Sequence, residues 1–212
     1  MINMFNIVLH EPEKPDNTGN IGRTCVATGS ALHLIYPIGF QLTRKNIHHA
    51  GLDYWDRLKL FKHSSYNEFV KYFTNQPACV DTIHPSACAD TIHSSACADT
   101  IHQPVGADII RPSVCTDCRK PVLWYATTKA HKSYTDVKFN DGDFIMFGKE
   151  SAGIPEEILA NDEEHCIRIP MMENERSLNL SNSVAIVLYE ALRQNNFTGL
   201  IKKGELHRLK YE

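Results

Sequence analysis

Short, predominantly apolar runs recur along the chain and alternate with amphipathic segments. The runs cover residues 4–9, 32–36, 122–126, 144–147 and 166–169. Runs of this length without a polar face are typical of strands that are buried on both sides of a parallel sheet. The pattern therefore predicts a strand at each of these five places.

Residues 64–73 have the periodicity of an amphipathic helix. Their apolar and aromatic side chains recur at helical spacing, at Tyr66, Phe69, Val70 and Phe73. Ser65 and Glu68 have the spacing of a capping box, in which each side chain accepts a hydrogen bond from the other residue's backbone amide. We therefore expect this helix to begin beside Ser65.

The clearest helix lies near the C-terminus. Its apolar stripe consists of Val184, Val187, Leu188, Ala191 and Leu192. We expect this helix to end before Gly199. Shorter helices are predicted at residues 21–27, before Gly29, and from residue 154, where Pro155 suits a first turn. Strands that alternate with helices predict an α/β fold with a mostly parallel sheet flanked by helices.

Length and composition fit one domain. The chain has 212 residues, of which 42% are hydrophobic and 22% are charged, values that are near the globular average. Its longest apolar runs are far shorter than the ~20 residues of a membrane-spanning helix. Residues 1–9 carry no basic segment and no cleavage signal. We therefore expect a cytoplasmic protein with no membrane association, whose seven cysteines are thiols.

Residues 76–118 interrupt this pattern with a repeat. Three successive nine-residue units, ACVDTIHPS, ACADTIHSS and ACADTIHQP, begin at Ala78, and the repeat then degenerates. Five of the seven cysteines lie in this segment. A near-perfect short repeat in a non-repetitive chain indicates an insertion. We therefore expect a single domain over residues 1–212 that is interrupted at about residues 76–118.

Two interpretations of the insertion are open. Cys115 and Cys118 have the spacing of a zinc site, and His84, His93 and His102 recur with the repeat. Within a unit, however, Cys and His lie five positions apart, which matches no familiar tetrahedral site. We therefore favour a tandem expansion in a surface loop, which costs little closure entropy, and we expect no metal requirement.

The charge pattern is informative only after the insertion is set aside. The formal net charge is −3, while residues 76–118 alone carry −4. The remaining residues are therefore almost neutral, so any anion-binding site must be local. The chain also lacks a glycine-rich dinucleotide turn, a P-loop, a nucleophile elbow and a zinc-protease histidine pair. These absences argue against dehydrogenases, NTPases and common hydrolases.

Three polar segments follow predicted strands, where ligands bind in parallel α/β sheets. Residues 17–23 read NTGNIGR, residues 148–155 read GKESAGIP, and residues 169–182 read IPMMENERSLNLSN. In order and spacing they resemble the three motifs of the SPOUT methyltransferases, in the SpoU branch that methylates ribose. Residues 48–54 (HHAGLDY) and 126–129 (ATTK) resemble the small single-domain members that act on the tRNA wobble nucleotide.

The resemblance implies a fold and a cofactor. The SPOUT fold has a deep trefoil knot in its C-terminal part, an exception to the rule that chains do not thread loops. S-adenosylmethionine binds among the knotted loops. Matched by position, the residues expected to bind it are Ala126, Thr127, Gly148, Gly153, Ile169, Met171, Ser177, Leu178 and Asn179.

The resemblance assigns catalysis to Arg23, at the ribose 2′-hydroxyl and its adjoining phosphate. A guanidinium is a poor base because its pKa lies above ~12. Arg23 is therefore expected to orient the hydroxyl and to neutralise phosphate. We expect Asn17 and Asn20 to hold their loop through side-chain hydrogen bonds. Glu150 would either steady the knotted loop or receive Arg23 from a second subunit.

Candidate RNA contacts are basic residues and two aromatic segments. The basic set is Arg23, Arg44, Lys45, His48, His49, Arg57, Lys59, Lys62, His63 and Arg176. Eight of these ten lie between Arg44 and His63. Tyr54 and Trp55 could stack on a base or belong to the core. Tyr189, on the last helix, could serve a dimer interface or the RNA site.

The resemblance implies a homodimer that transfers a methyl group from S-adenosylmethionine to the 2′-oxygen of cytidine 34 or 5-modified uridine 34 of leucine tRNAs, which it binds at the anticodon loop. One alternative is the same chemistry at another tRNA or rRNA site. Another is a non-enzymatic RNA- or cofactor-binding module that the insertion has disabled. A third is a metal-responsive regulator that acts through the repeats.

Overall fold

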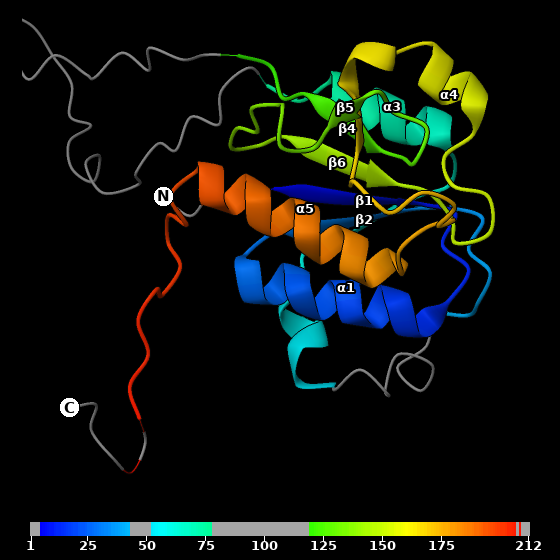
Figure 1. Ribbon diagram of the computed structural model, residues 1–212. Coiled ribbons are helices and arrows are strands. Elements are labelled where there is room, and N and C mark those ends of the chain that lie inside the picture. The colour runs from blue at the N-terminus through cyan, green and yellow to red at the C-terminus, as the bar shows by residue number, and fades with distance from the viewer. Residues whose placement is uncertain (1–4, 43–51, 78–118, 207, 209–212) are drawn as a thin grey trace, which may run out of the picture. The chain divides into compact units, whose positions relative to one another are not determined.

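The computed structural model describes residues 5–42, 52–77, 119–206 and 208. The chain divides into one unit of residues 1–76 and 121–212 and a second unit of residues 77–120. The repeats lie in the second unit and outside the described residues. The fold given below is that of the first unit (Figure 1).

Seven strands form one sheet in the order β3-β2-β1-β6-β4-β7-β5, and every neighbouring pair is parallel. The strands are β1 (Asn6–His10), β2 (Ala31–Ile35), β3 (Leu60–His63), β4 (Leu123–Ala126), β5 (Lys132–Ser133), β6 (Phe144–Phe147) and β7 (Cys166–Arg168). The five predicted strands are β1, β2, β4, β6 and β7, and all are present. The mostly parallel α/β architecture is confirmed.

The register brings the carboxyl ends of the central strands together. Leu9 of β1 pairs with Phe147 of β6, and Phe147 pairs with Ala126 of β4. Ala126 in turn pairs with Ile167 of β7. The loops that leave β1, β4, β6 and β7 therefore start side by side at one edge of the sheet.

Helices cover both faces of the sheet (Figure 1). The α-helices are α1 (Pro15–Thr28), α3 (Tyr66–Thr74), α4 (Glu156–Ala160) and α5 (Leu180–Gln194), and the 3₁₀ helices are η2 (Leu52–Arg57) and η3 (Glu163–His165). Helices α1 and α5 lie side by side on one face, while α3 and α4 cover the other. None of the helices in the described part of the chain has the length and apolar character needed to cross a membrane.

Each face of the sheet has its own buried core. Ile21 of α1 and Val184 and Leu188 of α5 pack on one face, against strand residues such as Leu9. On the other face, Phe69 of α3 packs in a cluster with Val8, Met146 and Leu159. Burial of these side chains is the main force that holds the helices to the sheet.

The first helix begins earlier than its sequence indicates. Helix α1 starts at Pro15 rather than at residue 21, so the first motif is helical. Asn, Thr and Gly are weak helix formers, and they hide this start. Pro15 suits a first turn, and Asn17, Thr18 and Gly19 are buried. The predicted end is correct, since Gly29 caps the helix in the left-handed conformation at φ 73°.

Helix α3 shows half of the predicted capping box. The hydroxyl of Ser65 accepts a hydrogen bond from the amide of Glu68 at 3.3 Å. The Glu68 carboxylate, however, accepts from the amide and the hydroxyl of Ser64 instead of from the amide of Ser65. Strands β3 and β5 are not predicted, because β3 is half polar and β5 has only two residues.

Candidate active site

A pocket opens beside the carboxyl ends of β4 and β7. Its lining residues are Thr127, Thr128, Ile169, Met171, Ser177, Leu178 and Ser183. Thr127 and Thr128 directly follow β4, and Ile169 follows β7. The amide of Thr127 donates to the carbonyl of Ile167 at 2.8 Å, which keeps the chain after β4 against β7. The other lining residues come from the segment that leads into α5 and from its first turn.

Sequence reasoning found most of this lining. The structure brings together five of the nine expected cofactor residues, namely Thr127, Ile169, Met171, Ser177 and Leu178. It adds Thr128 and Ser183, which were missed. Thr128 lies inside the ATTK segment, so the resemblance of that segment could have pointed to it. Ser183 carried no signal of its own; it lines the pocket because its amide bonds to the carbonyl of Asn179 in the first turn of α5.

The second motif forms a tight turn that requires glycine. Gly148 is buried, and a Cβ there would lie 2.0 Å from the carbonyl carbon of Gly153. Gly153 has φ +74°, and its amide donates to the carbonyl of Lys149 at 2.9 Å. The other four expected residues do not line the pocket themselves: Ala126, Gly148, Gly153 and Asn179. A part in cofactor binding stays a prediction for all nine residues.

Glu150 ties the second motif to the start of the first. Its carboxylate accepts hydrogen bonds from the amide of Glu13 at 2.9 Å and from the amide of Lys14 at 3.2 Å. It also accepts from the side-chain amide of Asn17 at 2.9 Å. Three donors on one carboxylate fix the loop after β6 against the N-terminus of α1, where a negative charge is favoured. Glu150 therefore steadies its own loop, which is the first of the two roles expected for it.

Asn17 extends this network to the third motif. The Oδ1 atom of Asn17 accepts a hydrogen bond from the Nδ2 atom of Asn179 at 3.0 Å. Asn179 caps α5, because its own Oδ1 accepts from the amides of Ser181 and Asn182 at 2.9 Å and 3.3 Å. The three motifs are thus joined by a chain of hydrogen bonds to which each contributes one residue: Glu150, Asn17 and Asn179.

Two further contacts reinforce the joint between the β1 and β6 loops. Lys149 forms an ion pair of 2.8 Å with Glu11, which raises the pKa of Lys149. Ser151 donates its hydroxyl to Glu13 at 2.7 Å and its amide at 3.0 Å. The hydroxyl bond is the main cause that lowers the pKa of Glu13. The two loops therefore form one hydrogen-bonded body next to the pocket.

Arg23 lies further along α1, with an exposed side chain. It does not line the pocket of its own chain. The buried Asn17 and the exposed Arg23 therefore divide the first motif into a part that joins the loops and a part that faces outward. The catalytic role of Arg23 stays a prediction.

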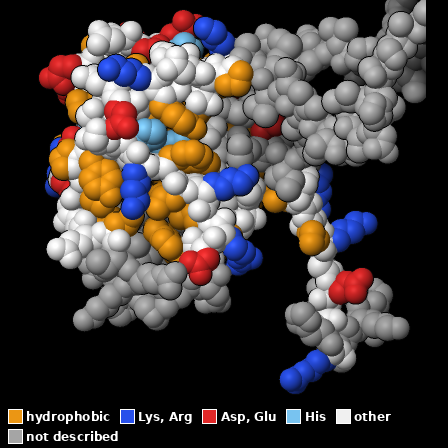
Figure 2. Space-filling view, turned by 180° about the vertical axis from the view of Figure 1, so that it is seen from behind, with side chains coloured by type: hydrophobic (Ala, Val, Ile, Leu, Met, Phe, Trp, Pro, Cys, Tyr) orange, Lys and Arg blue, Asp and Glu red, His pale blue; other side chains and the backbone are white. Residues whose placement is uncertain are grey.

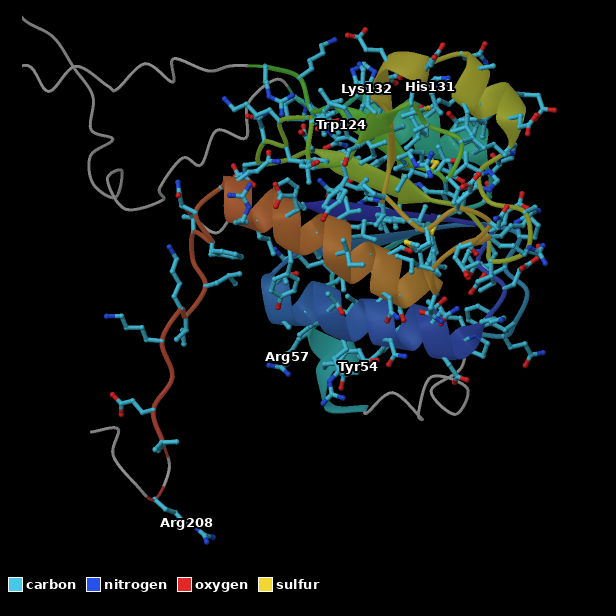
Figure 3. The ribbon with its side chains drawn as sticks, in the orientation of Figure 1. Tyr54, Arg57, Trp124, His131, Lys132 and Arg208 are labelled. Atoms are coloured by element: carbon cyan, nitrogen blue, oxygen red, sulfur yellow. The ribbon has the colours of Figure 1, made fainter. Side chains whose placement is uncertain are left out.

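The basic candidates fall into three groups. Arg57, Lys59, Lys62 and Arg176 are exposed, and Arg57 points away from the body of the protein beneath α1 (Figure 3). Arg44, Lys45, His48 and His49 lie outside the described residues. The prediction for His63 is wrong, because His63 is 4% exposed and its Nε2 lies 3.0 Å from Nδ1 of His33. Strand alternation turns its ring inward from β3.

Exposure also separates the three aromatic candidates, of which Trp55 is half-buried. Tyr54 is 5% exposed and belongs to the interior, so it cannot stack on a base. Tyr189 is 48% exposed on α5 and stays available for either of its expected roles. On the face seen in Figure 2, the described Lys and Arg side chains are scattered among apolar ones rather than gathered in one patch.

No group of three or more His, Cys, Asp or Glu side chains within the described ranges could hold a metal ion. The repeats with their Cys and His lie outside those ranges.

Comparison with known families decides the assignment. The model of the SpoU rRNA Methylase family matches residues 4–106 and 111–189. The chain belongs to the SpoU methylase family. All three of the joined segments lie within the matched residues.

Curated relatives match along nearly their whole length. The tRNA (cytidine(34)-2'-O)-methyltransferase of Escherichia coli (strain K12) is 36% identical over 199 residues, covering 93% of this chain and 98% of the relative. The protein of the same name from Saccharophagus degradans is 36% identical over 197 residues, covering 92% and 99%.

Solved structures agree with the fold. One described as concerning "2-OH methylation of C/U34 on tRNA" has a TM-score of 0.66 and 32% identity, covering 92% of this chain and 99% of the other. The SpoU methyltransferase AviRb from Streptomyces viridochromogenes, solved in complex with the cofactor AdoMet, has a TM-score of 0.64. At 17% identity, AviRb supports the fold alone.

Proposed function

We propose that this protein is an S-adenosylmethionine-dependent methyltransferase that acts on the ribose 2′-oxygen of nucleotide 34 of tRNA. The observation that carries the proposal is the near full-length similarity to relatives named for this reaction. The hydrogen bonds that join the three motifs support it, because they build the site from the same segments.

The pocket has the chemistry to hold S-adenosylmethionine. Ile169, Met171 and Leu178 offer apolar contact to an adenine ring, and the hydroxyls of Thr127, Thr128, Ser177 and Ser183 offer hydrogen bonds to polar groups. When bound, the sulfonium of the cofactor supplies an activated methyl group. The protein's contribution is to hold cofactor and ribose at the distance and angle for transfer.

Arg23 would bind and orient the substrate. Its guanidinium can donate to a ribose oxygen and to a phosphate oxygen at the same time. A guanidinium is a poor base, so the role proposed for Arg23 is to orient the 2′-hydroxyl, whose proton passes to solvent water as the methyl group is transferred. Arg57, Lys59 and Tyr189, together with Arg44 and Lys45, would contact the anticodon loop.

The finer points of the proposal extend the family resemblance. They are a C-terminal trefoil knot, a homodimer whose sites each take Arg23 from the other subunit, and leucine tRNAs as substrates in the cytoplasm. The strand order supports the knot, since β6 enters between β1 and β4, and β7 enters between β4 and β5. Residues 76–118 would be an insertion into one catalytic domain, because α3 before it and β4 after it belong to one sheet unit.

The test is methyl transfer from labelled S-adenosylmethionine to total tRNA, followed by nuclease digestion and nucleoside analysis. We expect 2′-O-methylated cytidine or uridine, and we expect its loss in Arg23→Ala. The same assay on rRNA tests the alternative substrate class. A folded, cofactor-binding protein that labels neither RNA would contradict the proposal.

A further inference from the structure

The 3₁₀ helix η2 is anchored to the first motif through Tyr54. The ring of Tyr54 is buried, and its hydroxyl donates to the carbonyl oxygen of Gly19 at 2.7 Å. The residue lies directly beneath α1, with its ring toward that helix (Figure 3). Such a bond between a buried hydroxyl and a helix carbonyl holds the two segments at a fixed distance.

Gly22 provides the space in which this anchor fits. A Cβ at Gly22 would lie 3.3 Å from Cζ3 of Trp55, 3.3 Å from Cδ2 of Leu58 and 3.5 Å from Cε2 of Tyr54. The rings of Tyr54 and Trp55 therefore pack against a part of α1 that has no side chain. A Cβ at this position would press on these side chains of η2 and the residue after it, which would have to shift by a few tenths of an ångström.

Both contact points, Gly19 and Gly22, lie within one helical turn before Arg23. Gly19 lies four positions before Arg23, so its carbonyl is the helical acceptor for the Arg23 amide. Gly22 is the residue directly before Arg23. Two glycines in one turn make the helix backbone soft, because glycine has low helix propensity. The η2 anchor therefore restrains α1 at the place where Arg23 projects.

The side chains of Tyr54 and Arg23 also interact electrostatically. Burial raises the pKa of Tyr54, and the positive charge of Arg23 acts in the opposite direction.

We propose that Tyr54 is a positioning residue, which fixes the backbone of residues 19–23 and so aims Arg23 at the ribose 2′-hydroxyl. This inference rests on the proposed function. Tyr54 itself is buried and does not touch the substrate. It acts through Arg23 and through no other group of the site.

The test is Tyr54→Phe, which keeps the ring and removes the hydroxyl, with kinetics measured for tRNA and cofactor. We expect kcat to fall roughly 10-fold, since small misplacement of a reacting group is costly. The Kd of S-adenosylmethionine should stay within about twofold, because Tyr54 is not in the pocket. Tyr72→Phe is the matched control, because it removes a phenolic hydroxyl from α3 on the opposite face of the sheet.

Two comparisons separate positioning from a merely structural role. In an Arg23→Ala background, Tyr54→Phe should cause no further loss of rate, because the group through which it acts is gone. By NMR of labelled tyrosine, Arg23→Ala should raise the pKa of Tyr54 further. An equal loss of rate in both backgrounds, or an unshifted Tyr54 titration, would overturn the inference.

Failure of this inference differs from failure of the proposed function. If the protein forms no methylated product from any RNA, both are overturned. If it forms product and Tyr54→Phe forms it equally fast, only the positioning role is overturned. Gly22→Ala provides an independent second variant, and we expect it to lower kcat while circular dichroism shows a folded protein.

Discussion

The side-chain amide of Asn179 donates to that of Asn17 across 3.0 Å, although the two residues lie 162 positions apart. Asn17 in turn donates to Glu150 at 2.9 Å. Asn17 is 6% exposed and uses both ends of its amide, so a carboxylate cannot replace it. The pocket beside α5 therefore depends on a residue that does not line it.

We expect Asn17→Asp to destabilise the protein. The new carboxylate keeps the acceptor for Asn179, but it loses the donor and places a second negative charge against Glu150. The cost should be about 1–3 kcal/mol of unfolding free energy, with weaker binding of S-adenosylmethionine. Thermal unfolding and calorimetry measure the two effects.

The matched rescue is Asn17→Asp combined with Glu150→Gln. The glutamine amide can donate to the new aspartate, so we expect at least half of the lost stability to return. If the double variant is as unstable as the sum of the two single variants, Asn17 and Glu150 do not interact as described.

Gly148→Ala tests whether the second motif needs glycine for steric reasons. The added Cβ would lie 2.0 Å from the backbone of Gly153, so the turn must open. We expect a loss of more than about 3 kcal/mol and loss of cofactor binding. The control is Gly142→Ala, where φ is +86° but no atom lies within 4 Å.

Gly142→Ala should cost only the strain of a left-handed residue, about 1–2 kcal/mol, and should leave cofactor binding intact. Equal effects of the two substitutions, measured by denaturant unfolding and calorimetry, would show that the close approach of Gly153 is not what requires glycine at position 148.

Acid should destabilise the fold through its buried histidines. Burial, aided by the neighbouring His63, lowers the pKa of His33 to about 3, and the pKa values of His63 and His10 are also lowered. A group whose pKa is lowered on folding binds its proton more readily in the unfolded chain. The stability from neutral His33 is therefore complete above pH ~6.5 and falls as the pH drops toward 3.

For His33 alone, the free energy of unfolding should fall by roughly 2 kcal/mol as the pH drops from 6.5 to 5. Chemical unfolding across this range measures it, with His33→Gln as the comparison. The variant should show a flatter dependence on pH, even if it is less stable at pH 7. A slope equal to that of the unaltered protein would assign the acid sensitivity to other groups.

The sequence was most informative where burial follows a simple period. The apolar runs located β6 to the residue, and the stripe from Val184 to Leu192 located α5. The start of α1 was missed because Asn17 and Gly19, which are buried in this helix, are weak helix formers. Strand β3 was missed because its position at the sheet edge leaves polar side chains outside.

The candidate site likewise contains residues that the sequence predicted and residues that it did not. The resemblance located Thr127, Ile169 and Ser177, because the segments that carry it follow strands β4 and β7. Ser183 and the burial of His63 depend on how separate segments pack, which no local pattern encodes. The link from Glu150 through Asn17 to Asn179 likewise depends on the fold that brings them together.

The most direct measurement is methyl transfer to a tRNA transcript that carries either ribose or 2′-deoxyribose at position 34. The two substrates have the same shape and charge and differ in one hydroxyl. We predict one methyl group per ribose transcript, at nucleotide 34, and none on the deoxy transcript. Equal labelling of both transcripts would contradict the assignment of the 2′-oxygen of nucleotide 34 as the methyl acceptor.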